Sequence, residues 1–269
     1  LNSPITVSNG MTSAAGTMGF NQPITGPGNL TVTGTATLNG GVNNSGTQEV
    51  IVQNGGGLTV SGGTSNITQL RLMTSNLGLS GTAVVNVSRL VTCDAASTTS
   101  VVNQSGGTLN ITGTDNSNTT SSSFLVGHWS GTTTSTYNLS GGTINSTATL
   151  MSFGWDAPTV NFNQSGGTFN LLGINLANSH PNSAVYHLTG GRLNLGASGI
   201  TTNVAKSIRL GGGTLGAFAN WTSSQPVELT GTGGDVTVNT LDSVDGATAR
   251  SIILTGQVSG TGGLTKSGN

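Results

Sequence analysis

The chain has 269 residues and a mass of 26.7 kDa, and its 7 Lys and Arg against 8 Asp and Glu give a formal net charge of −1. Charged residues make up 6% of the sequence, whereas about a quarter is usual in a soluble domain. This scarcity excludes the basic surface that nucleic acid requires, so we expect no nucleic-acid partner. A single Cys excludes a disulfide framework within the chain. The 44 Gly residues, together with abundant Thr, Asn, Ser and Val, disfavour helices and predict an all-β protein.

The first residues give no sign of a targeting or membrane segment. Residues 1–4 lack the basic-then-apolar layout of a signal peptide, and we expect such a signal to have been removed from this chain. No run approaches the roughly 18 apolar residues of a membrane helix, so we expect no membrane span. Pro4, Pro23 and Pro27 interrupt the pattern of the first 28 residues. We therefore predict an irregular N-terminal cap or inter-subunit contact segment over 1–28, followed by one repeat domain over 29–269.

An eight-residue phrase recurs through the middle of the chain. Its four close copies, each built around a Gly pair, span residues 103–110, 138–145, 163–170 and 187–194. The last Gly of the four copies and of two degraded copies falls at 107, 142, 167, 191, 213 and 234, so the spacings are 35, 25, 24, 22 and 21 residues. A fixed period of this length indicates a repeat architecture. We interpret the 35-residue interval as one unit enlarged by a polar loop over 115–123.

Each unit predicts strands separated by a glycine bend. Apolar and polar residues mostly alternate on both sides of the Gly pair, which is typical of β-strands, and Gly accepts the positive φ that a sharp bend demands. A third apolar stretch follows in each unit. Units of 21–26 residues with three short strands match the coils of a parallel β-helix, and the Gly anchors predict about ten coils. Stacked coils would place Leu109, Ile144, Phe169, Leu193 and Leu215 in one apolar column and Asn110, Asn145, Asn170 and Asn194 in a side-chain amide ladder.

The end of the chain resembles a known bacterial repeat. Residues 258–268 read Val-Ser-Gly-Thr-Gly-Gly-Leu-Thr-Lys-Ser-Gly and resemble the start of the autotransporter-associated β-strand repeat. The phrase at 137–143 is similar to repeats in large secreted and surface proteins of the same bacteria. The resemblance implies a right-handed β-helix exported to the cell surface, with a structural or adhesive role. In the family the repeat continues past the position of Asn269.

Unusual side chains gather where the third stretches end. One interpretation is a shallow groove in which Trp side chains stack on sugar rings while Asp and His side chains bind hydroxyl groups. The simpler alternative is a turn edge where bulky residues cover the corners of the coil. The residues of this candidate carbohydrate-contact column are Asp94, His128, Trp129, Trp155, Asp156 and His180.

Other chemistry has little support in the sequence. Asp242 and Asp245 flank a predicted turn at Asp245–Gly246, and their segment has few of the six to eight oxygens that Ca²⁺ prefers. Two His residues and Asp156 lack the short spacing of dedicated metal ligands. Cys93 is expected to be a small buried hydrophobic residue. We therefore predict no catalytic residue, no metal and no cofactor.

These patterns favour a structural role over an enzymatic one. We expect an extracellular or bacterial cell-surface β-helix, structural or adhesive, that forms a fibre, sheath or filament by head-to-tail stacking with itself. Extracellular polysaccharide is a further candidate partner. The alternative is a β-helical polysaccharide lyase or glycoside hydrolase. Glycoside hydrolysis requires paired carboxylates, and the chain has only 8 acidic residues along its whole length.

Overall fold

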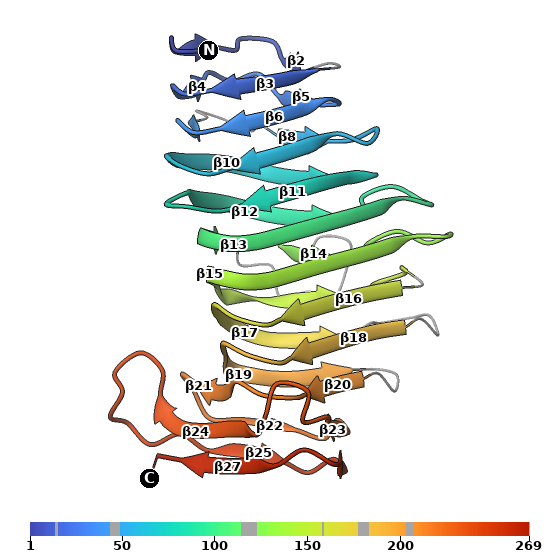
Figure 1. Cartoon of the computed structure of the whole chain (residues 1–269), viewed down its shortest axis with the longest axis vertical. Helices are drawn as coiled ribbons and strands as arrows, with labels where there is room; N and C mark the ends of the chain where they lie inside the picture. Colours follow the sequence, from blue (N-terminus) through green and yellow to red (C-terminus); the bar gives the residue numbers. More distant parts are fainter. Residues whose placement is uncertain are drawn as a thin grey trace.

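The computed structural model describes residues 1–13, 16–43, 49–113, 123–157, 159–176, 183–202 and 207–268. These residues form 27 β-strands and no helix, and every strand pair among them is parallel. Figure 1 shows the strands stacked along one axis, with the two termini at opposite ends. The all-β prediction is confirmed, and the parallel stacking is consistent with a β-helix. Residues 115–122 of the predicted polar loop lie outside the described residues.

The parallel pairings arrange the strands in three columns. The first column contains β1 (Ile5–Thr6), β4 (Ile24–Thr25), β7 (Val42–Asn43), β10 (Thr64–Leu72), β12 (Val84–Thr92), β13 (Thr99–Ile111), β15 (Thr134–Phe153), β17 (Thr168–Leu176), β19 (Arg192–Thr202), β21 (Thr214–Ala217), β24 (Val236–Asp242) and β27 (Leu264–Ser267).

The other two columns share the long strands, which bend from one side of the stack to the next. The second column adds to them β2 (Met11–Ser13), β5 (Leu30–Val32), β8 (Glu49–Val52) and β14 (Phe124–Val126). A separate pair follows, formed by β22 (Trp221–Ser223) and β25 (Ile252–Leu254). The third column adds β3 (Thr17–Phe20), β6 (Thr35–Leu38), β9 (Gly57–Val60), β11 (Ser75–Leu79), β16 (Thr159–Gln164), β18 (Ser183–Leu188), β20 (Ser207–Leu210), β23 (Val227–Leu229) and β26 (Val258–Gly260).

The register confirms the predicted apolar column and the predicted amide ladder. Leu109 pairs with Ile144, which pairs with Phe169, and the column continues to Leu193 and Leu215, all at most 1% exposed. One residue further along each strand, the Asn side chains are hydrogen-bonded from turn to turn through Nδ2–H and Oδ1. Among the described side chains, its rungs are Asn66, Asn86, Asn110, Asn145, Asn170 and Asn194, and the N···O distances lie between 2.7 and 2.9 Å.

The glycine pairs allow the backbones of successive turns to touch. Gly107 and Gly142 have φ values of 66° and 76°, so the predicted left-handed bend is present. A Cβ atom at Gly142 would lie 2.4 Å from the carbonyl oxygen of Gly107, which leaves no room for a side chain. The pairs do not interrupt the strands in every turn, because β13 and β15 continue through them with irregular register. These strands are therefore longer than the short strands that the sequence predicts.

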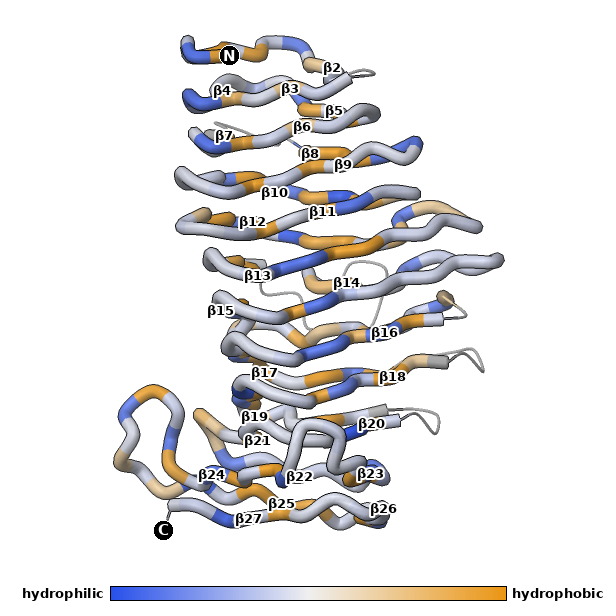
Figure 2. The backbone as a smooth tube through the Cα atoms, in the orientation of Figure 1, coloured by the Kyte–Doolittle hydropathy of each residue, from blue (hydrophilic) through white to orange (hydrophobic). Residues whose placement is uncertain are grey.

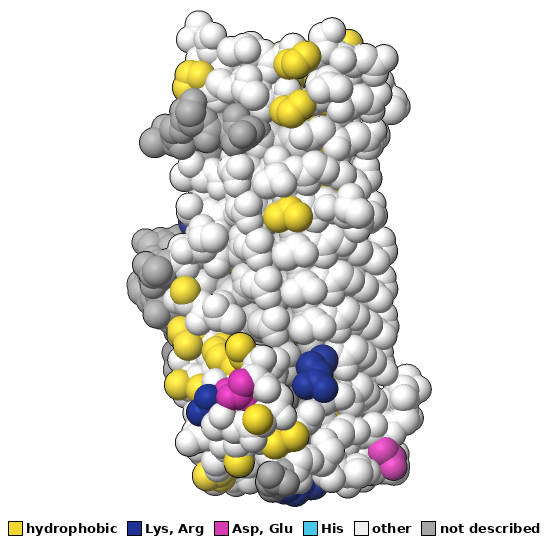
Figure 3. Space-filling view, turned by 90° about the vertical axis from the view of Figure 1, so that its left-hand side faces the viewer, with side chains coloured by type: hydrophobic (Ala, Val, Ile, Leu, Met, Phe, Trp, Pro, Cys, Tyr) yellow, Lys and Arg dark blue, Asp and Glu magenta, His cyan; other side chains and the backbone are white. Residues whose placement is uncertain are grey.

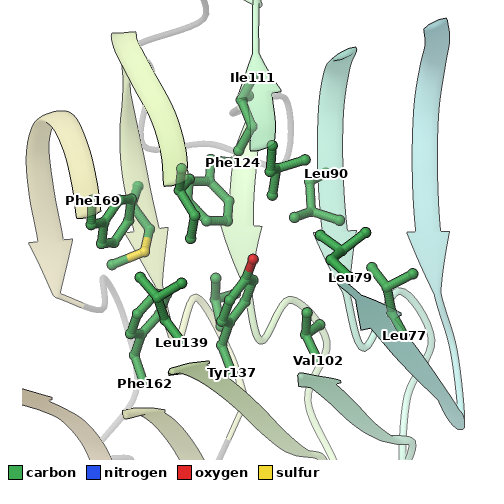
Figure 4. Packing of buried hydrophobic residues seen from close by; sticks show 14 of the residues in the cluster. Leu77, Leu79, Leu90, Val102, Ile111, Phe124, Tyr137, Leu139, Phe162 and Phe169 are labelled. Carbon is green, nitrogen blue, oxygen red and sulfur yellow. The ribbon is translucent and has the colours of Figure 1, made fainter. Parts of the chain in front are cut away.

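The interior is filled by aliphatic residues and a group of aromatic rings. Figure 2 shows hydrophobic residues recurring at similar places in successive turns, and Figure 4 shows buried side chains from several strands meeting inside the stack. Phe162 stacks against Tyr137 with ring centroids 4.7 Å apart and against Tyr186 at 5.2 Å. Such contacts add about 0.5–1.5 kcal/mol per pair beyond burial.

Two glutamines inside this apolar interior accept hydrogen bonds from buried tyrosines. The Tyr137 hydroxyl donates to Gln104 Oε1 at 2.7 Å, and the Tyr186 hydroxyl donates to Gln164 Oε1 at 2.5 Å. Gln164 is fully buried, and its amide nitrogen donates to the carbonyl oxygen of Arg192 at 3.0 Å. A buried hydroxyl without a partner would be costly, so each Tyr–Gln pair makes the polar atoms acceptable in the core. Burial raises the pKa of both tyrosines.

The strand stack begins before residue 28. Within the segment predicted as a cap or contact, β1 pairs with β4, while β2 and β3 pair with β5 and β6 of the next turn. Val7 and Phe20 are buried, at 6% and 1% exposure. The parallel pairing therefore continues across the boundary that the prolines suggested. Pro4 and Pro23 each stand directly before a strand of only two residues.

Replacing Phe169 tests the register of the core. Phe169→Ala should lower the free energy of unfolding by about 3–5 kcal/mol, since it leaves a cavity between Ile144 and Leu193. Phe169→Asp should prevent folding, because it places an unpaired carboxylate in the dry interior. Thr132, which is exposed, provides the control, and Thr132→Asp should change stability by no more than about 0.5 kcal/mol. Chemical denaturation followed by circular dichroism measures all three variants. A Phe169→Asp protein that folds and unfolds at the same midpoint as Thr132→Asp would contradict this register.

Candidate functional site

A bend after the second column of strands brings the predicted site residues onto successive turns. Cys93, Gly127 and Gly154 each have a left-handed backbone, with φ values of 55°, 80° and 71°. The following residues are joined by backbone hydrogen bonds, from Trp129 N to the Cys93 oxygen at 3.2 Å and from Trp155 N to the Gly127 oxygen at 2.9 Å. This corner therefore recurs at the same point in three turns. Cys93 occupies a position that is glycine in the next two turns.

Asp94 is the centre of a hydrogen-bonded cluster at this corner. Its Oδ1 accepts from His128 Nδ1 at 2.8 Å and from the indole Nε1–H of Trp129 at 3.3 Å, while its Oδ2 accepts from Arg71 Nε. The Asp94 and His128 side chains are each only 7% exposed. Burial opposes ionisation of Asp94, but the hydrogen bonds from His128 and Arg71 prevail and lower the pKa of the carboxyl group. A buried, ionised carboxylate with three donors is suited to holding its neighbours in place rather than to exchanging protons.

Arg71 extends the cluster along the stack. Its NH1 group lies 3.2 Å from Oε2 of Glu49, so one guanidinium bridges two carboxylates. Gln69 lies in register between Glu49 and Arg89. With its amide oriented to satisfy both neighbours, Gln69 donates to Glu49 Oε1 at 2.8 Å and accepts from Arg89 at 2.5 Å. We call the residues Glu49, Gln69, Arg71, Arg89, Asp94, His128 and Trp129 the charged corner.

Four members of the charged corner were not predicted from the sequence. Glu49, Gln69, Arg71 and Arg89 lie on β8, β10 and β12, before the stretch from which the column was predicted. A signal was present in the spacing, since residues 49, 69 and 89 are 20 apart and therefore occupy equivalent positions in successive turns. In a chain with 15 charged residues (7 basic and 8 acidic), four at one corner is a marked concentration.

The remaining predicted residues differ in their access to a ligand. Trp129 is 46% exposed, whereas Trp155 and Asp156 are half-buried one turn further on. The rings of His128 and Trp129 are tilted against each other, with centroids 5.3 Å apart. His180 lies outside the described residues. The exposed face of Trp129 can stack on a flat apolar surface, whereas Asp94 and His128 are engaged with each other.

The acidic residues near the C-terminus form a turn, as predicted. Asp242 Oδ1 accepts from the backbone N–H of Val244 at 2.7 Å, and Asp242 Oδ2 lies 2.5 Å from Arg250 NH2. Asp245 Oδ1 accepts from the N–H groups of Ala247 and Thr248, both at 2.8 Å. Hydrogen bonds from the Thr248 hydroxyl and these N–H groups lower the pKa of Asp245 to about 2. Both carboxylates thus organise their own loop.

Cys93 is fully buried, as predicted for a small hydrophobic residue. Its Sγ lies 3.2 Å from the carbonyl oxygen of Thr134, and burial raises the pKa of the thiol. Among the described residues, no group of three or more His, Cys, Asp and Glu side chains is placed to hold a metal ion. Nor do they include a helix long and apolar enough to cross a membrane.

Comparison with family models, with curated proteins and with solved structures gave no match.

The charged corner predicts how stability depends on pH. Since the folded pKa of Asp94 is lowered, its stabilising effect is present above the unfolded value of about 3.9 and is lost as pH falls through the lower folded pKa. Asp94→Asn should therefore reduce the free energy of unfolding by about 1–3 kcal/mol at pH 7, because His128 and Arg71 lose a charged partner. The difference from the unmodified protein should shrink below about pH 4.

The exposed Arg209–Glu228 ion pair, with side chains 42% and 47% exposed, provides the control. Glu228→Gln should cost at most about 1 kcal/mol at pH 7. Urea unfolding from pH 3 to 8 measures both variants. An Asp94→Asn protein as stable as Glu228→Gln at pH 7 would contradict a structural role for the buried carboxylate.

Proposed function

We propose that this chain is a structural or adhesive β-helix that stacks head to tail into an extracellular fibre, sheath or filament. The observation that carries the proposal is the open apolar interior at the last turn. Val258 pairs with Val227, and Leu264 pairs with Val236. Val227 and Val236 are 2% and 1% exposed, but Val258 and Leu264 are both 44% exposed. The inward columns thus end on apolar side chains that a further turn would cover.

The first turn has matching properties. Ile5 and Met11 are half-buried and pair with Ile24 and Leu30, which are each 2% exposed one turn further in. Both ends therefore present the same type of apolar column beside an edge of unpaired backbone groups, and such edges readily pair with another chain. Parallel stacking of a further turn, supplied by another copy or by repeats that continue the same chain, would satisfy the backbone and bury these residues.

The sides of the stack are compatible with dense packing of the chains. Figure 3 shows one side on which charged side chains are few and most of the surface is polar but neutral. With 6% charged residues and a net charge of −1, repulsion between neighbouring copies is weak. The resemblance to autotransporter-associated repeats supports a location outside the cell or on the bacterial surface, where polysaccharide is a natural contact.

The winding itself belongs to the proposal. We infer a right-handed solenoid, because parallel crossover connections are right-handed in nearly all known cases. The first column links twelve described strands in register from β1 to β27, which supports a slightly larger number of turns than the ten inferred from the glycine anchors. At about 4.8 Å per turn, each copy would add somewhat more than 50 Å to a filament.

Self-association can be tested at the C-terminal end. Sedimentation velocity over a range of concentrations should show species larger than a monomer, and electron microscopy should show filaments. Leu264→Lys should shift the population to monomers, because a charge would then enter the stacked interface. Val244→Lys, at an apolar side chain that is 85% exposed on a loop, is the matched control and should leave assembly unchanged. A strictly monomeric protein at high concentration would refute the proposal.

A further inference from the structure

Two hollows in the surface lie on the same amide ladder. The first, of about 230 Å³, is lined by Asn66, Ile67, Thr68, Asn86, Ser88 and Thr112. The second, of about 450 Å³, is lined by Asn145, Thr147, Asn170, Phe218, Ser243 and Val244. Each hollow therefore contains two consecutive rungs of the ladder, and all twelve lining residues are uncharged.

Hydroxyl groups accompany the amides in these hollows. Four rungs of the ladder are followed two residues later by a Ser or Thr that lines one of the hollows, namely Thr68, Ser88, Thr112 and Thr147. The repeat thus generates Asn-x-Ser/Thr sequences for a structural reason, because the Asn builds the ladder and the hydroxyl lies beside it. In these four turns the surface beside the ladder presents an amide together with a hydroxyl group.

Asn170, in the second hollow, retains hydrogen-bonding capacity beyond the ladder. An Asn side chain has two N–H donors and two acceptor lone pairs on its oxygen. The ladder engages one N–H of Asn170 with Asn145, and one lone pair of the Asn170 oxygen with Asn194. The capacity that remains suits a ligand whose groups both donate and accept, as hydroxyl groups do. One rung beyond the second hollow, Asn194 is 2% exposed and its Oδ1 has no hydrogen-bond partner in the protein.

The second hollow also has an apolar wall. The half-buried ring of Phe218 lies over Gly196, where a Cβ atom would be 2.7 Å from the ring, so the glycine admits the aromatic side chain. Val244 lines the same hollow and is 85% exposed. Figure 3 shows hydrophobic side chains gathered near the C-terminal end of a surface that is otherwise mostly polar. Phe218 and Val244 together give this hollow an apolar surface.

The loop that carries Val244 is held in place. Ser243 N donates to the carbonyl oxygen of Ala217 at 2.8 Å, which ties the loop to β21. The Asp242–Arg250 ion pair closes the base of the loop, and Arg250 N donates to the carbonyl oxygen of Thr240 at 2.7 Å. Figure 1 shows this loop, after β24, projecting from the side of the stack. The loop with Val244 is thus constrained before a ligand binds, which lowers the entropic cost of binding.

We use the name ladder corner for the surface that the two hollows form along the amide ladder. We propose that the ladder corner binds a neutral polysaccharide, with Phe218 and Val244 forming an apolar platform at its C-terminal end. A sugar ring has hydroxyl groups around its rim and an apolar face of C–H groups, which match the amide and hydroxyl array and the Phe218 ring respectively. The absence of charge from both linings disfavours uronate or sulfated chains. This inference rests on the polysaccharide contact in the proposed function, but it assigns that contact to a corner other than the one that carries Trp129.

Binding is tested on the intact chain with soluble neutral polysaccharides (a β-glucan, a xylan and a mannan) and with alginate as the anionic probe. Affinity electrophoresis and titration calorimetry should show binding to at least one neutral polymer and none to alginate. Phe218→Ala should weaken that binding about tenfold, which corresponds to about 1.4 kcal/mol and to the range of aromatic contacts. Val244→Ser, at a side chain too exposed to affect folding, should weaken it as well.

Matched variants locate the site. Thr147→Val removes one hydroxyl from the second hollow and should weaken binding, whereas Thr136→Val, on the third column of strands, should not. Trp129→Ala should also leave binding unchanged. The proposal is overturned if no neutral polymer binds, if alginate binds equally well, or if Trp129→Ala abolishes binding that Phe218→Ala and Val244→Ser leave intact. Sedimentation of the same samples reports on stacking independently, so failure of glycan binding is distinguishable from failure of self-association.

Discussion

In-register hydrogen bonding between parallel strands of successive turns is the constraint on which this structure depends. Each turn lies on the one before it, so every side chain has the equivalent residue of the neighbouring turn as its closest companion. Each position therefore favours residue types that pack well against, or hydrogen-bond to, the same type in the next turn. Leu109, Ile144 and Phe169 form an apolar column for this reason, and Asn110, Asn145 and Asn170 form a chain of amide hydrogen bonds.

The same constraint explains why charge is scarce. A charged residue repeated in every turn would stack on a like charge, which is destabilising between directly opposed strand positions. The charges that are present follow this rule. Arg209 is in register with Glu228 and pairs with it, while Glu49 and Arg89 are separated by the neutral Gln69. Short neutral side chains avoid the conflict, and they leave a surface of amides and hydroxyls with little repulsion between molecules.

Stacking inside one chain and stacking between chains obey the same physics. The exposed Val258 and Leu264 continue the same inward columns as the buried Val227 and Val236. The proposed assembly extends the fold by its own repeat and requires no new type of contact. The ladder corner is a different kind of surface, because its regular polar array becomes a site only where Phe218 and the loop with Val244 interrupt the regularity.

The features that repeat could be predicted from the sequence alone. Alternating hydrophobicity and a phrase returning every 21–26 residues predicted the β-strands, the parallel stack, the Phe169 column and the Asn ladder, because equivalent positions of equal repeats must coincide in space. It also identified the Asp245–Gly246 turn, since the turn chemistry is local.

Features that depend on single, non-repeated residues became visible only in three dimensions. The buried contacts of Asp94 with Arg71 and His128 join residues 23 and 34 positions apart, and loops of unequal length hide that relation in the sequence. The Tyr186–Gln164 pair likewise makes a buried polar residue acceptable through a partner in the next turn. The approach of Val244 to the Asn145 and Asn170 rungs depends on how far the loop after β24 reaches across earlier turns. Periodicity specifies which residues stack, whereas contacts across loops depend on three-dimensional distances that the repeat pattern does not contain.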